Sequence, residues 1–155
     1  MLDVIWGLKT TSMFDAWSFD HFLNGLALGT SVLIFNKEYL GRAIFNLKDN
    51  SLSTQYINGL KYRYDLILLL LMSYFWEAVE HYLETGALGK TIEYWLQGVE
   101  FWPNRLIADP LLLILGYLVV KKWPRLVWPA RTICFVWLFV HIFIFPHSMY
   151  LHEIF

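Results

Sequence analysis

The feature that most constrains this chain is an apolar run that leads into a stripe of ionisable side chains. Residues 66–72 have no polar face, which is typical of a helix surrounded by lipid. Glu77, Glu80, His81 and Glu84 follow at helical spacing, so they share one face of the same helix. Ionisable groups at membrane depth are costly and face a protein interior or a wet cavity. The sequence therefore predicts a membrane helix whose end contributes to a polar site.

The composition indicates that other segments of the chain also enter the membrane. Of 155 residues, 57% are hydrophobic and 19% aromatic, well above an ordinary soluble domain. A helix needs about 20 residues to cross the hydrocarbon layer. Four segments are long and apolar enough, namely residues 18–35, 64–83, 103–120 and 129–145. We predict an all-α polytopic membrane protein with one membrane domain over 1–155, and a short interfacial or re-entrant helix before the third span.

The distribution of basic residues predicts the orientation of these spans. Nine of the 12 basic residues lie between the first two spans or near the start of the fourth, and they are Lys37, Arg42, Lys48, Lys61, Arg63, Lys121, Lys122, Arg125 and Arg131. The positive-inside rule places these regions in the cytoplasm and both termini outside. We expect residues 1–17 to rest at the outer interface as an anchor, and Asp65 to be a solvated charge near the inner headgroups.

Several function classes are excluded by what the sequence lacks. A net charge of −1 and the absence of a basic run with interleaved aromatics argue against nucleic acid as a partner. Cys134 is the only cysteine, so there is neither an intrachain disulfide nor a thiolate metal cluster. The chain has no phosphate-binding loop, dinucleotide fingerprint or Ser-His-Asp order.

Polar side chains at the outer ends of the first three spans predict a divalent metal site. The candidate ligands are imidazoles and carboxylates from three helices, and they are His21, Glu77, Glu80, His81 and Asp109. Such mixed ligands suit Zn, Fe or Mn. With a metal present, Glu80 is the candidate catalytic residue, as general base for a bound water. The competing interpretation is an ion-paired, proton-sharing cluster without metal. Haem b between His81 and His141 is disfavoured because their depths differ.

Other residues in the same region are expected to support the site. Asp20, Asn104 and Arg105 are assigned structural or ion-pair roles, with Arg105 as a counter-ion for the carboxylates. Gly25 and Gly29 form a small-xxx-small pair that lets another helix approach the first span. Pro110 is expected to kink the third span. The alternative, in which Asp109-Pro110 caps a helix that begins there, would leave residues 111–120 barely half the length of a span.

Four short motifs in these spans resemble those of a known class of membrane proteins. In chain order they are Asp20-His21-x-x-Asn24-Gly25, Trp76-Glu77-x-x-Glu80-His81, Gln97-Gly98-x-Glu100 and Asn104-x4-Asp109-x6-Gly116. Residues 18–117 resemble the small polytopic inner-membrane proteins of the YjdF type and, more distantly, VanZ-like membrane proteins. The resemblance implies a multi-helix membrane protein of largely unassigned biochemistry, with VanZ-like members linked to glycopeptide resistance at the cell envelope.

Two functions are consistent with these observations. The first is a small integral membrane protein whose extracytoplasmic polar pocket binds a divalent metal and acts, as a hydrolase or transferase, on an envelope or lipid substrate. The second is a non-catalytic accessory subunit of a larger membrane complex, in which the same polar residues hold the helices together. The expected partners are therefore membrane lipid and protein subunits of such a complex.

Overall fold

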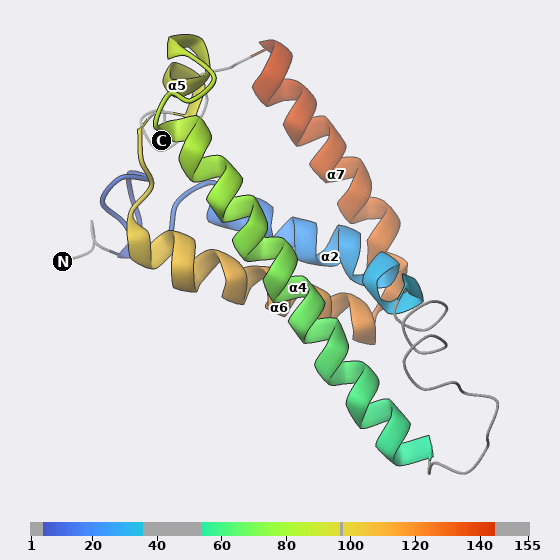
Figure 1. The fold of residues 1–155 in the computed structure, drawn as a ribbon. Coiled ribbons are helices and arrows are strands. Elements are labelled where there is room, and N and C mark those ends of the chain that lie inside the picture. The colour runs from blue at the N-terminus through green and yellow to red at the C-terminus, as the bar shows by residue number, and fades with distance from the viewer. Residues whose placement is uncertain (1–4, 36–53, 97, 145–155) are drawn as a thin grey trace.

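The described part of the chain is helical. The computed structural model describes residues 5–35, 54–96 and 98–144, and Figure 1 shows how they are arranged. Five α-helices make up most of these ranges: α2 Ser18–Phe35, α4 Thr54–Glu84, α5 Lys90–Leu96, α6 Asp109–Lys122 and α7 Val127–Phe139. No strand occurs within them, although Trp6 and Phe14 form one isolated bridge. The predicted all-α class is confirmed.

The helices agree closely with the four apolar segments, but they differ in length. The first helix, α2, has the predicted bounds, and α4 extends the second span toward its N-terminus to a total of 31 residues. The α-helical parts of the third and fourth segments are shorter, with 14 residues in α6 and 13 in α7. Among the described residues, one helix, Tyr64–Glu84, is long and apolar enough to cross a membrane. The short helix expected before the third segment is α5.

Short turns of other helix types extend α6 and α7. A π-helical turn, η2 Asn104–Ala108, precedes α6, and another, η4 Val140–Ile144, follows α7. A 3-10 turn, η3 Pro124–Leu126, connects α6 to α7. In η2 the amide of Asp109 donates to the carbonyl of Asn104, so the chain is already helical when it reaches Pro110. Pro110 lies in the first turn of α6, where a proline needs no amide partner. The third segment is therefore helical on both sides of Pro110, but α6 itself begins at Asp109 with Pro110 in its first turn, as in the alternative to the expected kink.

Glycines allow α2 and α6 to pack backbone against backbone. A Cβ atom on Gly25 would lie 2.1 Å from the carbonyl oxygen of Leu113, and one on Gly116 would lie 2.2 Å from that of Phe22. A Cβ on Gly29 would lie 2.6 Å from Cγ1 of Val120. The close approach predicted from Gly25 and Gly29 is thus confirmed, and α6 is the helix that approaches.

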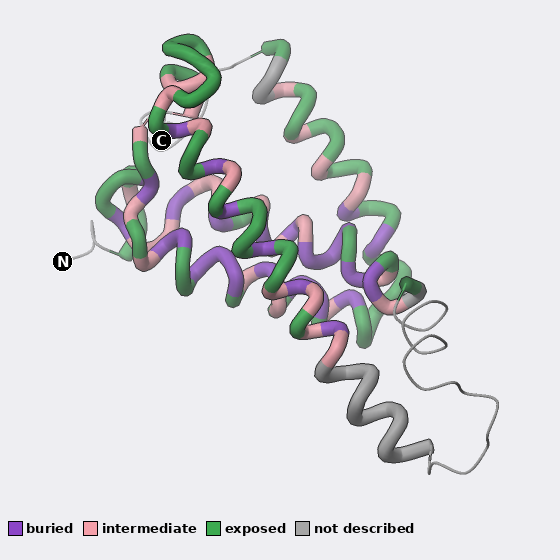
Figure 2. Tube along the Cα trace, in the orientation of Figure 1, coloured by how far each residue is buried: buried purple, intermediate pink, exposed green. Residues whose placement is uncertain are grey.

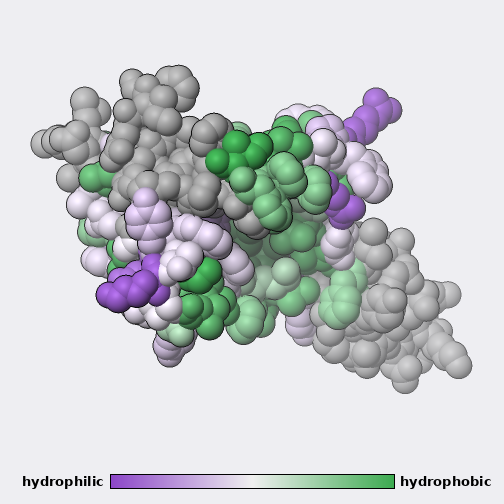
Figure 3. All heavy atoms as spheres, turned by 90° about the horizontal axis from the view of Figure 1, so that it is seen from above, coloured by the Kyte–Doolittle hydropathy of each residue, from purple (hydrophilic) through white to green (hydrophobic). Residues whose placement is uncertain are grey.

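The described surface is strongly apolar, and much of the interior is polar. Figure 3 shows apolar residues across the middle of one face and hydrophilic side chains toward its edges. Phe75 on α4 and Phe135 on α7 are 72% and 70% exposed, and α7 is exposed along most of its length (Figure 2). Asp65, in contrast, is buried and accepts a hydrogen bond from the Tyr117 hydroxyl at 2.7 Å. The expectation of a solvated Asp65 was therefore wrong, because α6 supplies a donor that the local sequence does not reveal.

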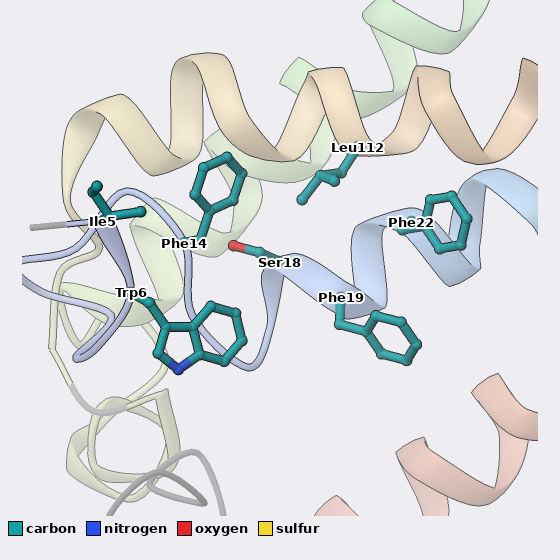
Figure 4. Close-up of a pocket in the computed structure, with 7 residues that line it drawn as sticks. All are labelled: Ile5, Trp6, Phe14, Ser18, Phe19, Phe22 and Leu112. Carbon is teal, nitrogen blue, oxygen red and sulfur yellow. The ribbon is translucent and has the colours of Figure 1, made fainter. Parts of the chain in front are cut away.

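The N-terminal segment, residues 5–17, folds onto the ends of the helices. Its side chains Trp6 and Phe14 lie beside Phe19 and Phe22 of α2 around an apolar hollow of about 380 Å³ (Figure 4). The same segment buries Lys9, Ser12 and Asp15. The expectation of a mere interfacial anchor was wrong, since this segment contributes charged groups to the interior.

Candidate metal centre

Ionisable side chains gather where the first residues of α2 and η2 meet the last turns of α4. Two sets of possible metal ligands form there, each with ligand atoms within 4.8 Å of one another. The first set, here called the triad, is His21, Glu77 and Asp109. The second, here called the glutamate cluster, is Glu80, Glu84 and Glu100. All six residues are buried.

The triad places one imidazole between two carboxylates. Nδ1 of His21 lies 3.6 Å from Oε1 of Glu77, and Nε2 of the same ring lies 3.3 Å from Oδ2 of Asp109. Glu77 is 2% exposed and Asp109 is fully buried, yet no oxygen of either carboxylate has a hydrogen-bond partner. Buried polar atoms in proteins are nearly always hydrogen-bonded or bound to an ion. These four oxygens therefore indicate a missing partner.

Each triad residue comes from a different helix, and the helix packing sets their common depth. His21 lies in the first turn of α2, and Asp109 is the first residue of α6. The glycine contacts between α2 and α6 bring these short side chains close together. Glu77 lies two turns before the end of α4, on the face that α4 turns toward the other two helices. The arrangement could hold a metal ion.

Two buried cations bind the glutamate cluster. Nζ of Lys9 lies 2.7 Å from Oε1 of Glu80 and 2.5 Å from Oε1 of Glu84. Arg105 forms an ion pair with Glu84 through Nη2, and its Nε lies 3.6 Å from Oε2 of Glu100. Lys9 and Arg105 are only 5% and 9% exposed. The second set is therefore neutralised in part by close ion pairs with the chain's own cations, whereas the ion pair of the triad with Arg105 is longer, with Nε 3.8 Å from Oε2 of Glu77.

The protonation of the groups outside the helices follows from their burial and their neighbours. Burial by itself would lower the pKa of Lys9, but the carboxylates of Glu80, Glu84 and Glu100 outweigh it and raise this pKa above the usual lysine value. Burial raises the pKa of Glu100 to about 9, against the opposing effect of Lys9. Burial likewise raises the pKa of Asp15. Lys9 is therefore charged, and Glu100 is mostly protonated at neutral pH.

A network of hydrogen bonds attaches the N-terminal segment to the start of α2 and to η2. Oδ1 of Asp15 accepts hydrogen bonds from the amides of Trp17 and Ser18 at 2.7 and 2.9 Å, which caps α2. Nδ2 of Asn104 donates to Asp15 at 3.1 Å and to Glu100 at 2.9 Å. The Ser18 hydroxyl donates to Oδ1 of Asn104 at 3.0 Å. Asn104 thus links the N-terminal segment to α2 and to the residues around η2.

The structure brings together three of the five predicted ligands. His21, Glu77 and Asp109 form the triad, whereas Glu80 points into the glutamate cluster and pairs with Lys9. His81 is exposed, and its Nδ1 lies 3.0 Å from Nη1 of Arg105. A general-base role for Glu80 would first require its ion pair with Lys9 to open.

The residues assigned structural roles have partners in this region. Arg105 reaches Glu77 with Nε 3.8 Å from Oε2, so the predicted pairing with the stripe is present, but its direct contact is with Glu84. Asp20 accepts a hydrogen bond from Nδ2 of Asn24 at 3.0 Å. The side chain of His141, considered for haem, lies outside what the structure describes.

Sequence reasoning missed Lys9, Asp15 and the place of Glu100 in the interior. Lys9 lies in a loop with no periodic pattern, so only charge balance could have pointed to it. The predicted outer half holds ten acidic residues against three basic ones, and Lys9 is one of those three. Such an imbalance predicts that each available cation will be drawn to the carboxylates.

A cavity of about 510 Å³ lies beside the triad. Side chains of α2, α4, α6 and α7 line it, and His21 belongs both to this lining and to the triad. The lining is mostly apolar. A ligand in this cavity would therefore contact apolar side chains and reach the triad at one end.

Comparisons with protein-family models, with curated proteins and with solved structures found no match to this chain. The resemblance to YjdF-type and VanZ-like proteins accordingly stays a prediction. The candidate function has to be argued from the site itself.

Proposed function

We propose that this chain is a multi-pass membrane protein that binds one divalent metal ion at the triad. Zn, Fe or Mn is the expected metal, since one imidazole and two carboxylates suit these ions. The observation that carries the proposal is the pair of buried carboxylates, Glu77 and Asp109, whose four oxygens have no hydrogen-bond partner. A metal ion would satisfy both carboxylates at once.

The membrane location is supported by the polarity of the surface. Large apolar side chains are exposed along α4 and α7, while charged groups are buried, the reverse of a soluble domain. Three segments besides Tyr64–Glu84 would cross the membrane in this proposal. They are α2, η2 with α6, and α7 with η4, each of about 18 residues or about 27 Å at 1.5 Å per residue. That length is close to the hydrocarbon thickness of about 30 Å.

The proposed orientation places the triad in the extracytoplasmic half of a bacterial inner membrane. Lys121, Lys122 and Arg125 lie at the opposite end of α6 from Asp109. By the positive-inside rule the basic end is cytoplasmic, so the triad end and both chain termini are extracytoplasmic.

Charge balance supports a bound cation. Among the described residues of the triad, the glutamate cluster and Asp15, six buried carboxylates face two buried cations, Lys9 and Arg105. Ionised carboxylates in a low-dielectric interior need cations or protons, because desolvation costs several kcal/mol per ion. With Glu100 protonated, five carboxylates remain against these two cations, and a divalent ion at the triad would offset two of the three excess charges.

Three protein ligands would leave coordination positions for water or substrate, as in catalytic metal sites. A metal ion there could lower the pKa of a bound water and polarise a substrate oxygen. We propose hydrolysis or group transfer on a lipid or envelope substrate as the reaction class.

Metal binding tests this proposal directly. The purified protein is stripped with a chelator, reloaded with manganese or zinc, and analysed for metal content and affinity. We expect one metal per chain in the wild type, and a loss of affinity of about tenfold or more in Glu77→Gln and Asp109→Asn, which remove a charged ligand at nearly constant shape. His81→Ala is the control, because His81 is exposed and lies outside the triad. Absence of stoichiometric metal in the wild type, or unchanged affinity in both triad variants, would contradict the proposal.

The second candidate function is an accessory subunit of a membrane complex. The seven residues of α5 include no buried residue, and Tyr94 and Trp95 on it are 59% and 36% exposed. Exposed aromatic side chains are common at protein interfaces. A wild type that binds no metal but copurifies from mild detergent with a constant partner, lost in Tyr94→Ala, would favour this candidate.

A further inference from the structure

The cavity beside the triad changes from polar to apolar along its length. On α2 its lining begins with Asp20 and His21, continues to Asn24, and ends at Leu28, about 10 Å along the helix from His21 at 1.5 Å per residue. On α4 it includes Ser73, one turn before Glu77, and Leu69, one turn further. Because α2 and α4 run in opposite directions (Figure 1), the polar residues of both linings lie nearer the triad than Leu28 and Leu69 do, although Phe75 and Trp76 also line the cavity near Glu77.

A buried hydroxyl in this lining has no partner. Ser73 is 4% exposed, and its Oγ forms no hydrogen bond, not even to the preceding turn of its own helix. Burying a hydroxyl without a hydrogen-bond partner costs free energy, so a serine at this position is unexpected if the cavity only ever holds apolar groups. The hydroxyl lies between the triad end and the apolar end, where it could bind a polar group of an elongated ligand.

We propose that the cavity binds one acyl chain of a membrane lipid whose phosphate head reaches the metal ion at the triad. This inference rests on the proposed metal site for the lipid head group, whereas the acyl chain would be held by the cavity alone. Its volume of about 510 Å³ falls within the usual range for ligand pockets, about 300–1,000 Å³. Leu69 and Leu28 would contact the chain, and the Ser73 hydroxyl would donate to an ester oxygen.

The position of the cavity explains how such a lipid would enter. Exposed side chains of α4 and α7, Phe75 and Phe135 among them, belong to the lining. The cavity therefore meets the apolar surface that the proposed orientation exposes to lipid. A free phosphate is a poorer match, because the walls beyond Asn24 and Ser73 offer it no polar contact.

Photo-crosslinking tests the lipid site on the full-length protein. The chain is reconstituted in bilayers of digalactosyl diacylglycerol, which contain no phosphate, with a trace of phosphatidic acid carrying a diazirine in one acyl chain. We expect crosslinks at the cavity residues of α4 and α7 when manganese is bound. Unlabelled phosphatidic acid should compete for them, diacylglycerol should not, and chelation should remove most of the signal.

Two tryptophan substitutions on α7 distinguish lipid bound in the cavity from lipid that only contacts the protein surface. Cys134→Trp fills the cavity and should lose most of the crosslinking while keeping stoichiometric manganese. Val136→Trp introduces the same side chain two residues away, at a position that is 53% exposed and outside the lining, and should keep both properties.

The outcomes distinguish this inference from the metal proposal. Crosslinks spread over the exposed surface, or unchanged in Cys134→Trp, would overturn the lipid site even if manganese binds. Cavity crosslinks that diacylglycerol displaces equally well, or that survive chelation, would overturn the phosphate contact. Cavity crosslinks in a wild type that binds no manganese would refute the metal site and the head-group contact together.

Discussion

At the scale of single residues, the triad and the glutamate cluster differ in how closely their carboxylates are paired with cations. Glu80 and Glu84 have Lys9 within 2.7 Å, and Glu84 also has Arg105. Glu77 and Asp109 have the His21 ring beside them, Arg105 lies 3.8 Å from Glu77, and the Ser18 hydroxyl lies close to Asp109. Carboxylates that are equally buried can therefore differ in whether the protein itself supplies a cation or a hydrogen-bond donor. An added cation would stabilise the fold most at the carboxylates that lack donors.

The protonated state of Glu100 predicts a pH-dependent stability. Its pKa is raised from 4.5 to about 9 by burial, so the folded chain holds a proton that the unfolded chain has lost over that interval. The stability that Glu100 contributes is complete below pH 4.5 and is lost as the pH rises toward 9. We expect the thermal midpoint of the wild type in detergent to fall between pH 5 and pH 9, and Glu100→Gln to reduce that fall.

Glu93→Gln is the control for this experiment, because Glu93 is a glutamate of the neighbouring helix α5 that is only partly buried. It should leave the pH dependence as in the wild type. Lys9 does not interfere, since its raised pKa affects stability only above the ordinary lysine value of 10.5. Identical pH profiles for Glu100→Gln and the wild type would show that Glu100 ionises normally.

At the scale of elements, the crossing of α2 and α6 is the contact on which the site depends. Gly25 faces the backbone of Leu113, and a backbone carbonyl cannot move aside without separating the helices. The π-helical turn η2 adds a second constraint, because it presents Arg105 and Asp109 to α4 and α2 from adjacent turns. Turns of this type are frequent at functional sites.

Gly25→Ala should destabilise the fold by about 1–3 kcal/mol, the usual cost of overpacking, despite a gain in helix propensity of about 1 kcal/mol. Gly29→Ala gains the same propensity on the same helix, but its nearest contact is the Val120 side chain, which can move. We therefore expect a lower thermal midpoint for Gly25→Ala than for Gly29→Ala, and weaker manganese binding in the former. Equal midpoints for the two variants would contradict the backbone contact.

At the scale of the whole molecule, the chain has charged groups inside and apolar groups outside. Apart from Asp65, the buried ionisable residues lie at the end where α2 and η2 begin, and Lys121, Lys122 and Arg125 lie at the other end of α6. Such polarity would orient the protein across a bilayer, with the triad at the extracytoplasmic end.

Single-cysteine labelling tests that orientation. In a Cys134→Ser background, Leu88→Cys places a thiol after α4, where Leu88 is 70% exposed, and Arg125→Cys places one in the exposed turn between α6 and α7. A membrane-impermeant maleimide should label position 88 in intact spheroplasts and position 125 only after permeabilisation. The reverse pattern would invert the topology, and labelling of both positions from outside would contradict the four-span arrangement.

The sequence alone determined the elements and the helix face on which the acidic residues lie. Apolar length and helical spacing are local properties, and they predicted α2 with its bounds, the long α4 and the stripe from Glu77 to Glu84. The glycine spacing at Gly25 and Gly29 also predicted a close helix contact. These properties depend on the geometry of one helix and need no knowledge of its neighbours.

Only the tertiary structure decided which polar groups meet. Glu77 and Glu80 are one turn apart, yet Glu77 joins His21 and Asp109 while Glu80 turns to Lys9. That division depends on where α2, η2 and the N-terminal segment approach α4. Those contacts join residues far apart in the sequence, 71 positions for Lys9 and Glu80, so no local pattern records them. Ion pairing and burial depend on such packing, which is why the sequence alone did not identify Lys9 as a buried partner of the carboxylates.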